Sequence, residues 1–177
     1  MSGRLRVEVV SSESLSDADR RNIILLCNRA YAEDLEPLFN TFGDAMHVLG
    51  FYAGSLVSHA MWVTRWLQPG SGRFLRTAYV EMVATEPEHR QRGFATEVMK
   101  HLADAITDFD LGALCPAEIS LYSRLGWVFW RGPLFIRMSG ELSPTPDERV
   151  MILHLPRTPL LDLDAPLSAE WRPGELW

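Results

Sequence analysis

The sequence predicts a single domain of mixed α/β class, and three observations support this prediction. The chain has 177 residues, 47% of them hydrophobic and 23% charged, which is enough for one well-packed core. Some segments repeat apolar residues with a period of two, and others repeat them at helical spacing. The two kinds of segment alternate along the chain without internal repeats or low-complexity stretches. We therefore expect one domain over residues 1–177.

The first half of the chain predicts a strand, two helices and then three strands. Leu5, Val7 and Val9 alternate with polar residues, as in a half-buried strand. Ser16 is typical of a helix N-cap, and Gly54 with Ser55 forms a hairpin signal. In order, we expect a strand over 4–10, helices from Ser16 and over 35–42, and strands over 45–53, 56–67 and 73–85.

The second half predicts a long helix followed by shorter elements. Phe94, Val98 and Leu102 step by four, which gives a helix one apolar face. Because this helix connects two apolar strands, we expect a crossover between parallel strands. The elements expected here are helices over 93–109 and 117–125 and strands over 111–114, 127–138 and 150–155.

Charge and composition exclude several classes of function. The net charge of −6 disfavours nucleic acid and suits a cationic ligand. The five histidines are scattered, and Cys27 and Cys115 fit neither a metal site nor a disulfide framework. No apolar run has the length of a membrane span, and the start lacks a signal-peptide core. We therefore expect a cytoplasmic protein without a metal or a membrane partner.

The junction between the strand over 73–85 and the long helix indicates an anion site. Arg90, Arg92 and Gly93 lie where the helix begins, and the N–H groups of a first helical turn attract anions. Gly93 permits close approach to the backbone, and Ala95 leaves the next turn uncrowded. This combination suits a pyrophosphate. The spacing matches neither the three-glycine dinucleotide pattern nor a Walker loop.

The chain resembles the GNAT superfamily of N-acetyltransferases. The resemblance rests on the strand–Arg-x-x-Gly-x-Ala–helix unit and on Leu121–Trp127, which ends a helix and opens a strand. It implies the GNAT fold, a central mixed twisted sheet of about six or seven strands flanked by about four helices. It also implies acetyl-CoA as cofactor and coenzyme A as product. The implied cofactor-binding residues are Met82, Val83 and Ala84 along the pantetheine arm and Arg90, Gln91, Arg92, Gly93, Phe94 and Ala95 around the pyrophosphate.

Within the superfamily, the sequence is similar to the aminoglycoside 2′-N-acetyltransferases. The ending Trp171–Trp177, with its Trp-Arg-x-Gly-acid-x-Trp pattern, is the most specific element of this similarity. The other matching segments are Tyr79–Glu81, Leu111–Leu114, Leu121–Tyr122, Gly126–Trp127 and Thr145–Asp147. The implied activity is direct acetyl transfer, in a ternary complex, to the 2′-amino group of an antibiotic, which confers resistance.

Two residues are candidates for the proton transfers of this reaction. Glu81 would remove a proton from the attacking amine, directly or through water, and would also bind the substrate. Tyr122 would donate a proton or hydrogen bond to the leaving sulfur. The N–H of Val83 is a candidate donor to the developing oxyanion. Without the resemblance, Glu81 would be read as an exposed strand residue and Tyr122 as a core tyrosine.

The resemblance also implies a ring of acids around a sugar carrying ammonium groups. The expected substrate-binding residues are Asp34, Glu81, Cys115, Asp147, Glu175 and the carboxylate of Trp177. Two departures affect them: related enzymes have aspartate where Glu175 stands, and Cys115–Ile119 replaces a serine-rich turn. With the added bulk of Trp62, Trp66, Phe129 and Trp130, these departures favour a smaller acceptor such as kasugamycin.

Two alternative functions stay open at this stage. One is a GNAT enzyme that acetylates another amine, such as a polyamine, a metabolite or a protein amine. The other is a non-catalytic acyl-CoA-binding domain, which the presence of Glu81 and Tyr122 disfavours. The resemblance further suggests a homodimer.

Overall fold

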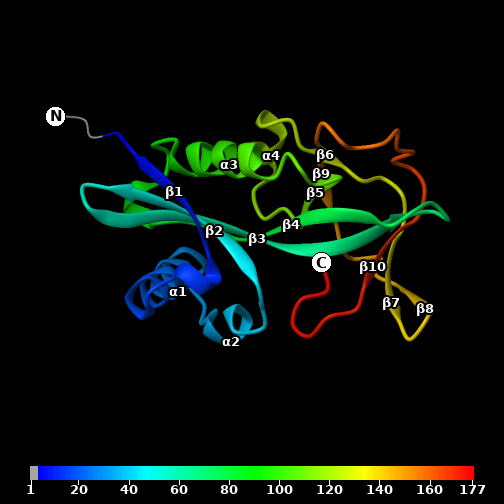
Figure 1. Cartoon of the computed structure of the whole chain (residues 1–177), viewed down its shortest axis with the longest axis horizontal. Helices are drawn as coiled ribbons and strands as arrows, with labels where there is room; N and C mark the ends of the chain where they lie inside the picture. Colours follow the sequence, from blue (N-terminus) through cyan, green and yellow to red (C-terminus); the bar gives the residue numbers. More distant parts are fainter. Residues whose placement is uncertain (1–3) are drawn as a thin grey trace. The chain divides into compact units, whose positions relative to one another are not determined.

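A computed structural model describes residues 4–177, which divide into two compact units. The first unit contains the described residues up to Val63 together with Val80–Ala105, and the second contains Thr64–Tyr79 and Ile106–Trp177. Two long strands, β3 (Ser55–Pro69) and β4 (Leu75–Thr85), run from one unit into the other (Figure 1).

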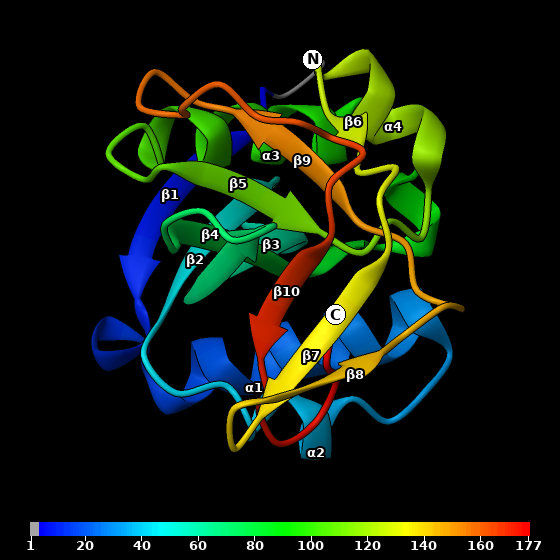
Figure 2. The ribbon, with the colours of Figure 1, turned by 90° about the vertical axis from the view of Figure 1, so that its right-hand side faces the viewer.

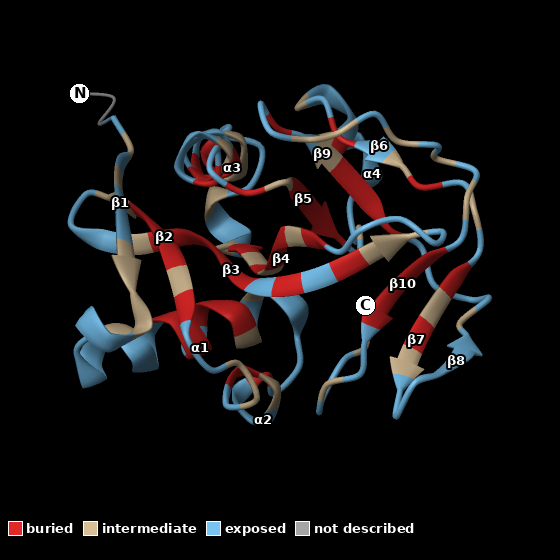
Figure 3. Cartoon of the chain, turned by 45° about the vertical axis from the view of Figure 1, so that its right-hand side comes forward, coloured by how far each residue is buried: buried red, intermediate tan, exposed pale blue. Residues whose placement is uncertain are grey.

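The first unit is an antiparallel sheet with helices on both faces. Strand β1 (Arg6–Ser11) pairs with β2 (Ala45–Tyr52), and β2 pairs with β3 around a turn at Ala53 and Gly54. Helices α1 (Asp17–Tyr31) and α3 (Phe94–Ala105) cover opposite faces of these strands (Figures 1 and 3). The short elements of this unit are η1 (Ser12–Ser14), α2 (Glu36–Phe39) and η2 (Pro87–His89).

Local signals explain how the helices of this unit begin and pack. The Ser16 side chain accepts the N–H of Asp19 at 3.1 Å, which confirms Ser16 as the N-cap of α1. Cys27 is fully buried on the apolar face of α1, as expected from its place in the pattern. Helix α3 buries Phe94, Val98 and Leu102, the residues whose spacing predicted it.

The second unit adds parallel and antiparallel pairs to β3 and β4. Strand β5 (Leu111–Leu114) runs parallel to β4, which confirms the predicted crossover. Next to β5, strand β9 (Met151–His154) pairs antiparallel with both β5 and β6 (Val128–Phe129). On the β3 side, β10 (Leu167–Glu170) pairs antiparallel with β3 and parallel with β7 (Leu134–Met138), and β8 (Glu141–Pro144) closes the edge (Figure 2). Helix α4 (Ile119–Arg124) completes the unit.

The mixed fold class is confirmed, although the strands are more numerous than expected. The described residues contain ten strands and four α-helices. The strands pair in the order β6-β9-β5-β4-β3-β10-β7-β8, and off this path β2 pairs with β3 and β1 with β2. The single strand expected over 127–138 is wrong, because the chain leaves the sheet between β6 and β7. There Arg131 and Gly132 donate to Leu163 O, and Pro133 has no N–H to donate. Strands β8 and β10 were not expected.

Candidate functional site

The distal part of β4, in the first unit, carries an irregularity next to the predicted base. Glu81 is half-buried, and Met82 follows it with φ of +53°, a left-handed conformation that is uncommon outside glycine. The register of β4 with β5 ends at Tyr79, so residues 81–84 lie beyond the parallel pairing. Side chains fix three successive carbonyls in this stretch. His59 Nδ1 donates to Met82 O at 2.8 Å, Tyr31 to Val83 O at 2.8 Å and Ser58 to Ala84 O at 3.2 Å.

The turn at residues 90–95, also in the first unit, has the geometry of an anion cradle. Gln91 and Gly93 have φ of +60° and +80°, so two residues just before α3 are in the left-handed conformation. A Cβ at Gly93 would meet nothing within 4 Å, which leaves the backbone accessible. The helical hydrogen bonding starts with Glu97 N–H to Gly93 O. The preceding N–H groups of the first turn therefore point toward any anion at the start of α3.

The two arginines of this turn are exposed, and each also contacts another part of the protein. Arg90 donates to Ala30 O at 2.6 Å, near the end of α1. The Arg92 guanidinium lies 4.3 Å from the Tyr52 ring centroid and 5.0 Å from that of Phe94. Both residues stay exposed and keep the turn positive. The fit to a pyrophosphate thus depends mainly on backbone N–H groups.

Asp34, the remaining substrate-binding candidate of the first unit, lies in the connection between α1 and α2. Its side chain is exposed and accepts the N–H of Glu36 at 3.1 Å and the Asn28 amide at 3.4 Å. This carboxylate therefore stabilises the start of α2, and its solvent-facing side can still meet a cation.

Tyr122, in the second unit, is a buried phenol on α4. Its ring packs edge-on against Trp127, with centroids 6.2 Å apart. Burial, with smaller contributions from Cys115 and Glu118, raises the pKa of Tyr122 to about 12. The hydroxyl is therefore protonated at neutral pH and can act as a donor. Cys115 and Glu118 themselves are exposed, and Glu118 caps α4 through Ser120.

The last residues of the chain pack within the second unit. Trp177 is 2% exposed, and its indole N–H donates to Thr145 Oγ1 at 2.8 Å. Arg65 holds this segment by donating to Leu176 O at 2.7 Å and to Glu170 O at 3.1 Å. A buried guanidinium needs such acceptors, so the interaction fixes the path of the tail. Glu175 is exposed.

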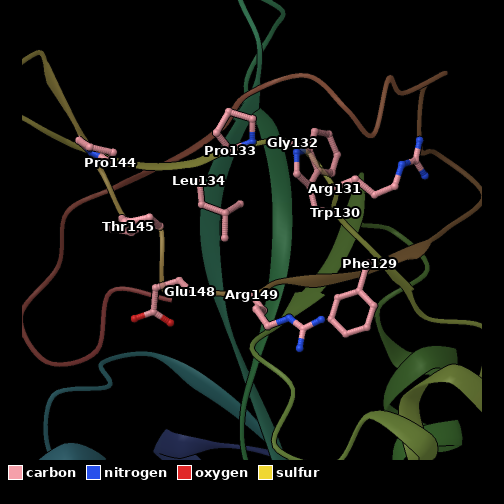
Figure 4. A pocket seen from close by; sticks show the side chains of 11 residues that line it. Phe129, Trp130, Arg131, Gly132, Pro133, Leu134, Pro144, Thr145, Glu148 and Arg149 are labelled. Carbon is pink, nitrogen blue, oxygen red and sulfur yellow. The ribbon is translucent and has the colours of Figure 1, made fainter.

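A cavity of about 690 Å³ lies within the second unit, between β6, β7 and the segment after β8 (Figure 4). Phe129, Trp130 and Leu134 supply apolar walls, and Glu148 and Arg149 supply charge. Thr145 lines the cavity while it accepts from Trp177. The exposed Asp147 lies in sequence between two lining residues, Pro146 and Glu148. Two of the expected substrate-binding residues therefore adjoin the lining of this cavity: Trp177 through its hydrogen bond to Thr145, and Asp147 through its neighbours in the sequence.

A buried histidine pair in the first unit escaped the sequence analysis. His47 and His59 lie on β2 and β3, and their ring nitrogens are 3.0 Å apart. Residues twelve apart give no local motif, but the hairpin places them diagonally, since His47 pairs with Met61. The sequence signal that could have indicated this pair is the presence of two histidines on the inward face of one predicted hairpin.

Two negative findings apply to residues 4–177. No group of three or more His, Cys, Asp or Glu side chains there could hold a metal ion. No helix in this part of the chain is long and apolar enough to cross a membrane.

The mixed sheet, the positive φ at Met82 in β4 and the turn at the start of α3 agree with an acetyltransferase of the GNAT type. Residues 13–129 match the acetyltransferase (GNAT) domain family, and the chain belongs to this family. It is 33% identical, over 139 residues, to an aminoglycoside 2′-N-acetyltransferase from Mycolicibacterium fortuitum, covering 75% of this chain and 71% of that protein.

Solved structures share the fold at lower sequence identity. The GNAT family N-acetyltransferase YhbS from Escherichia coli, solved in complex with CoA, superposes with a TM-score of 0.65 at 14% identity, covering 96% of this chain and 91% of that one. Eis1 from Mycobacterium abscessus superposes with a TM-score of 0.62 at 19% identity over 75% of this chain. The chain spans about a third of Eis1, since the match covers 33% of it.

Proposed function

We propose that the protein transfers an acetyl group from acetyl-CoA to the 2′-amino group of an aminoglycoside, directly in a ternary complex. The observation that carries this proposal is the 33% identity to an aminoglycoside 2′-N-acetyltransferase over 139 residues. The GNAT relative solved with CoA supports the choice of cofactor. We further propose that residues 1–177 act as one acetyltransferase domain.

On this proposal, the first unit holds the cofactor. The backbone of Met82, Val83 and Ala84 binds the pantetheine arm, and the turn from Arg90 to Ala95 binds the pyrophosphate. The N–H groups at the start of α3 and the accessible backbone at Gly93 fit that anion. Acetyl-CoA, when bound, supplies the activated acetyl group.

Glu81 and Tyr122 move the protons. Glu81 accepts a proton from the amine, directly or through water, because only a neutral amine is nucleophilic. Tyr122 donates to the departing sulfur, and the raised pKa keeps its phenol protonated at the pH of the reaction. The N–H of Val83 donates to the acetyl carbonyl as negative charge develops there.

Acids and the second-unit cavity bind the acceptor. Asp34, Glu81, Asp147, Glu175 and Trp177 supply carboxylates for ammonium groups, and Cys115 contributes from the altered turn. One observation favours a weakly cationic acceptor of the kasugamycin type. Phe129, Trp130 and Arg149 line the cavity, whereas a ring of carboxylates would suit an acceptor with many ammonium groups better. A homodimer and a cytoplasmic location remain predictions.

Thiol release from acetyl-CoA against a panel of amines tests this function. Kanamycin B and kanamycin A form the matched pair, because the second has a hydroxyl at the 2′ position. Tobramycin, gentamicin, kasugamycin, spermidine and a lysine peptide complete the panel. We expect turnover with 2′-amino compounds and none with kanamycin A, and turnover with kasugamycin alone would indicate the narrower pocket. Turnover confined to spermidine or the peptide would contradict the aminoglycoside assignment.

A further inference from the structure

A chain of buried hydrogen bonds in the first unit ends at the irregularity in β4. Ser12 Oγ lies 3.0 Å from His47 Nε2, His47 Nδ1 lies 3.0 Å from His59 Nε2, and His59 Nδ1 lies 2.8 Å from Met82 O. The two imidazoles are 1% and 0% exposed. Two adjacent polar rings in a core are costly unless their hydrogen bonds are satisfied, so this arrangement calls for an explanation beyond packing.

The chemistry of the acceptor at its end fixes the direction of the whole chain. A carbonyl oxygen only accepts, so His59 Nδ1 must carry the proton and donate to Met82 O. In a neutral ring, His59 Nε2 then accepts from His47 Nδ1–H, and His47 Nε2 accepts from the Ser12 hydroxyl. Burial lowers the pKa of His47 to about 4 and that of His59 to about 3, which keeps both rings neutral. Ser12 Oγ in turn accepts the N–H of Ala45 at 3.3 Å.

The bond to Met82 O orients the next N–H group. The described residues contain no cis peptide, and in a trans peptide the C=O and the following N–H point in opposite directions. His59, on the neighbouring strand β3, draws the Met82 carbonyl toward β3. The N–H of Val83 therefore points toward the opposite edge of β4, past the end of its pairing with β5. The positive φ of Met82 is a strained conformation that such an anchor can maintain.

We propose that His59 is a positioning residue, which holds the Met82–Val83 peptide so that Val83 N–H faces the carbonyl of the bound acetyl group. His47 and Ser12 hold His59 in the tautomer that donates to Met82 O. This proposal rests on the proposed function, since it assigns the acetyl carbonyl as the partner of Val83 N–H. It extends that function to residues that contact neither substrate nor cofactor.

Two amide variants separate this role from a general contribution to stability. In His59→Asn, the side-chain N–H₂ takes the place of ring Nδ1 and keeps the bond to Met82 O. In His59→Gln, the amide takes the place of Nε2, which keeps the contact with His47 and loses the one with Met82. Both variants put one neutral amide into the same core site, so they are matched in chemistry.

The measurement is calorimetric binding of CoA and of a non-hydrolysable ketone analogue of acetyl-CoA. CoA lacks the acetyl carbonyl, so only the analogue senses the position of Val83 N–H. We expect His59→Gln to weaken analogue binding about tenfold while CoA binding stays within about twofold, as for the loss of one hydrogen bond. His59→Asn should bind both ligands within about twofold of the wild type.

Each of the following results would overturn the proposal. Equal losses for CoA and the analogue would indicate a purely structural role for His59. An unchanged analogue affinity in a folded His59→Gln protein would show that the peptide needs no anchor. If the wild-type protein bound neither ligand, the proposed function itself would be wrong, and the positioning role would fail with it. Should His59→Gln not fold, Ser12→Ala is the substitute. We expect a smaller selective loss of analogue binding, and no selective loss would refute the role of this chain of hydrogen bonds.

Discussion

The two units contribute to the proposed site in different ways. In the first unit, the groups assigned to the cofactor are backbone atoms. Hydrogen bonds from side chains of other elements fix some of them, such as those from His59 to Met82 O and from Tyr31 to Val83 O. In the second unit, most groups assigned to the acceptor are exposed side chains, including Cys115, Asp147 and Glu175. A cofactor common to a family suits a rigid backbone cradle, whereas acceptor choice can change with exposed side chains.

The largest effect is expected from Glu81→Gln, which changes the proposed base on β4. Loss of the base should lower kcat/KM by about 10²–10³-fold, within the range for general base catalysis. The loss should grow as the pH falls, because more of the amine is then protonated. Steady-state kinetics across pH measure this effect, and CoA affinity serves as the control. A loss that is the same at every pH would assign Glu81 to substrate binding instead.

Tyr122→Phe tests the proposed general acid, the buried phenol of the second unit. Removal of the hydroxyl should lower kcat by about 100-fold, the lower end of the range for a general acid. CoA affinity should not change, since the groups proposed to bind the cofactor lie in the first unit. Single-turnover kinetics with acetyl-CoA and calorimetry with CoA give the two readouts. Unchanged turnover would remove Tyr122 from the mechanism.

Gly132→Ala is expected to destabilise the segment that forms the cavity of the second unit. A Cβ at Gly132 would lie 1.9 Å from Ala165 O and 2.6 Å from Asp164 O, so the backbone must move. Overpacking of this kind costs about 1–3 kcal/mol, and chemical denaturation measures the loss. Gly43→Ala is the matched control, because a Cβ there meets nothing within 4 Å. Equal stability of the two variants would contradict the tight packing around Gly132.

The last expected effect is a pH dependence of stability that originates in the first unit. The folded pKa values of about 4 for His47 and about 3 for His59 lie below the ordinary value of 6.5, because both rings are buried and Arg20 and His47 add positive charge. The contribution of each histidine to the free energy of unfolding is therefore complete above pH 6.5, and it is lost as the pH falls toward the pKa of that histidine in the folded protein.

Each buried histidine should make the unfolding free energy fall by at most about 1.4 kcal/mol per pH unit below that point. His59→Asn should fall less steeply than the wild type between about pH 6 and pH 4.5. Urea unfolding at several pH values measures the two slopes. Equal slopes would show that His59 is not held neutral in the folded protein.

Sequence patterns predicted the elements whose signals are local and missed those that depend on distant partners. The Ser16 cap and the apolar step of α3 were sufficient to place α1 and α3. The break between β6 and β7 depends on Leu163, which lies more than thirty residues further along the chain. Likewise, the histidine pair depends on the register of a hairpin, which alternation alone does not specify.

The same distinction applies to the site. The turn from Arg90 to Ala95 was recognisable because a helix start and a glycine are local features. The contacts of Arg90 and Arg92 were not predictable, because Ala30 and Tyr52 come from other elements. The acids assigned to the acceptor are exposed, and exposure alone does not distinguish a substrate ligand from an ordinary surface charge.

The most direct test of the central claim is to record backbone amide NMR shifts of the uniformly ¹⁵N-labelled protein during titration with CoA. If the first unit holds the cofactor through its backbone, the amides of Val83, Gly93, Phe94 and Ala95 should shift together and saturate with one affinity. An absence of shifts at these amides at saturating CoA, or shifts confined to the second unit, would contradict the account.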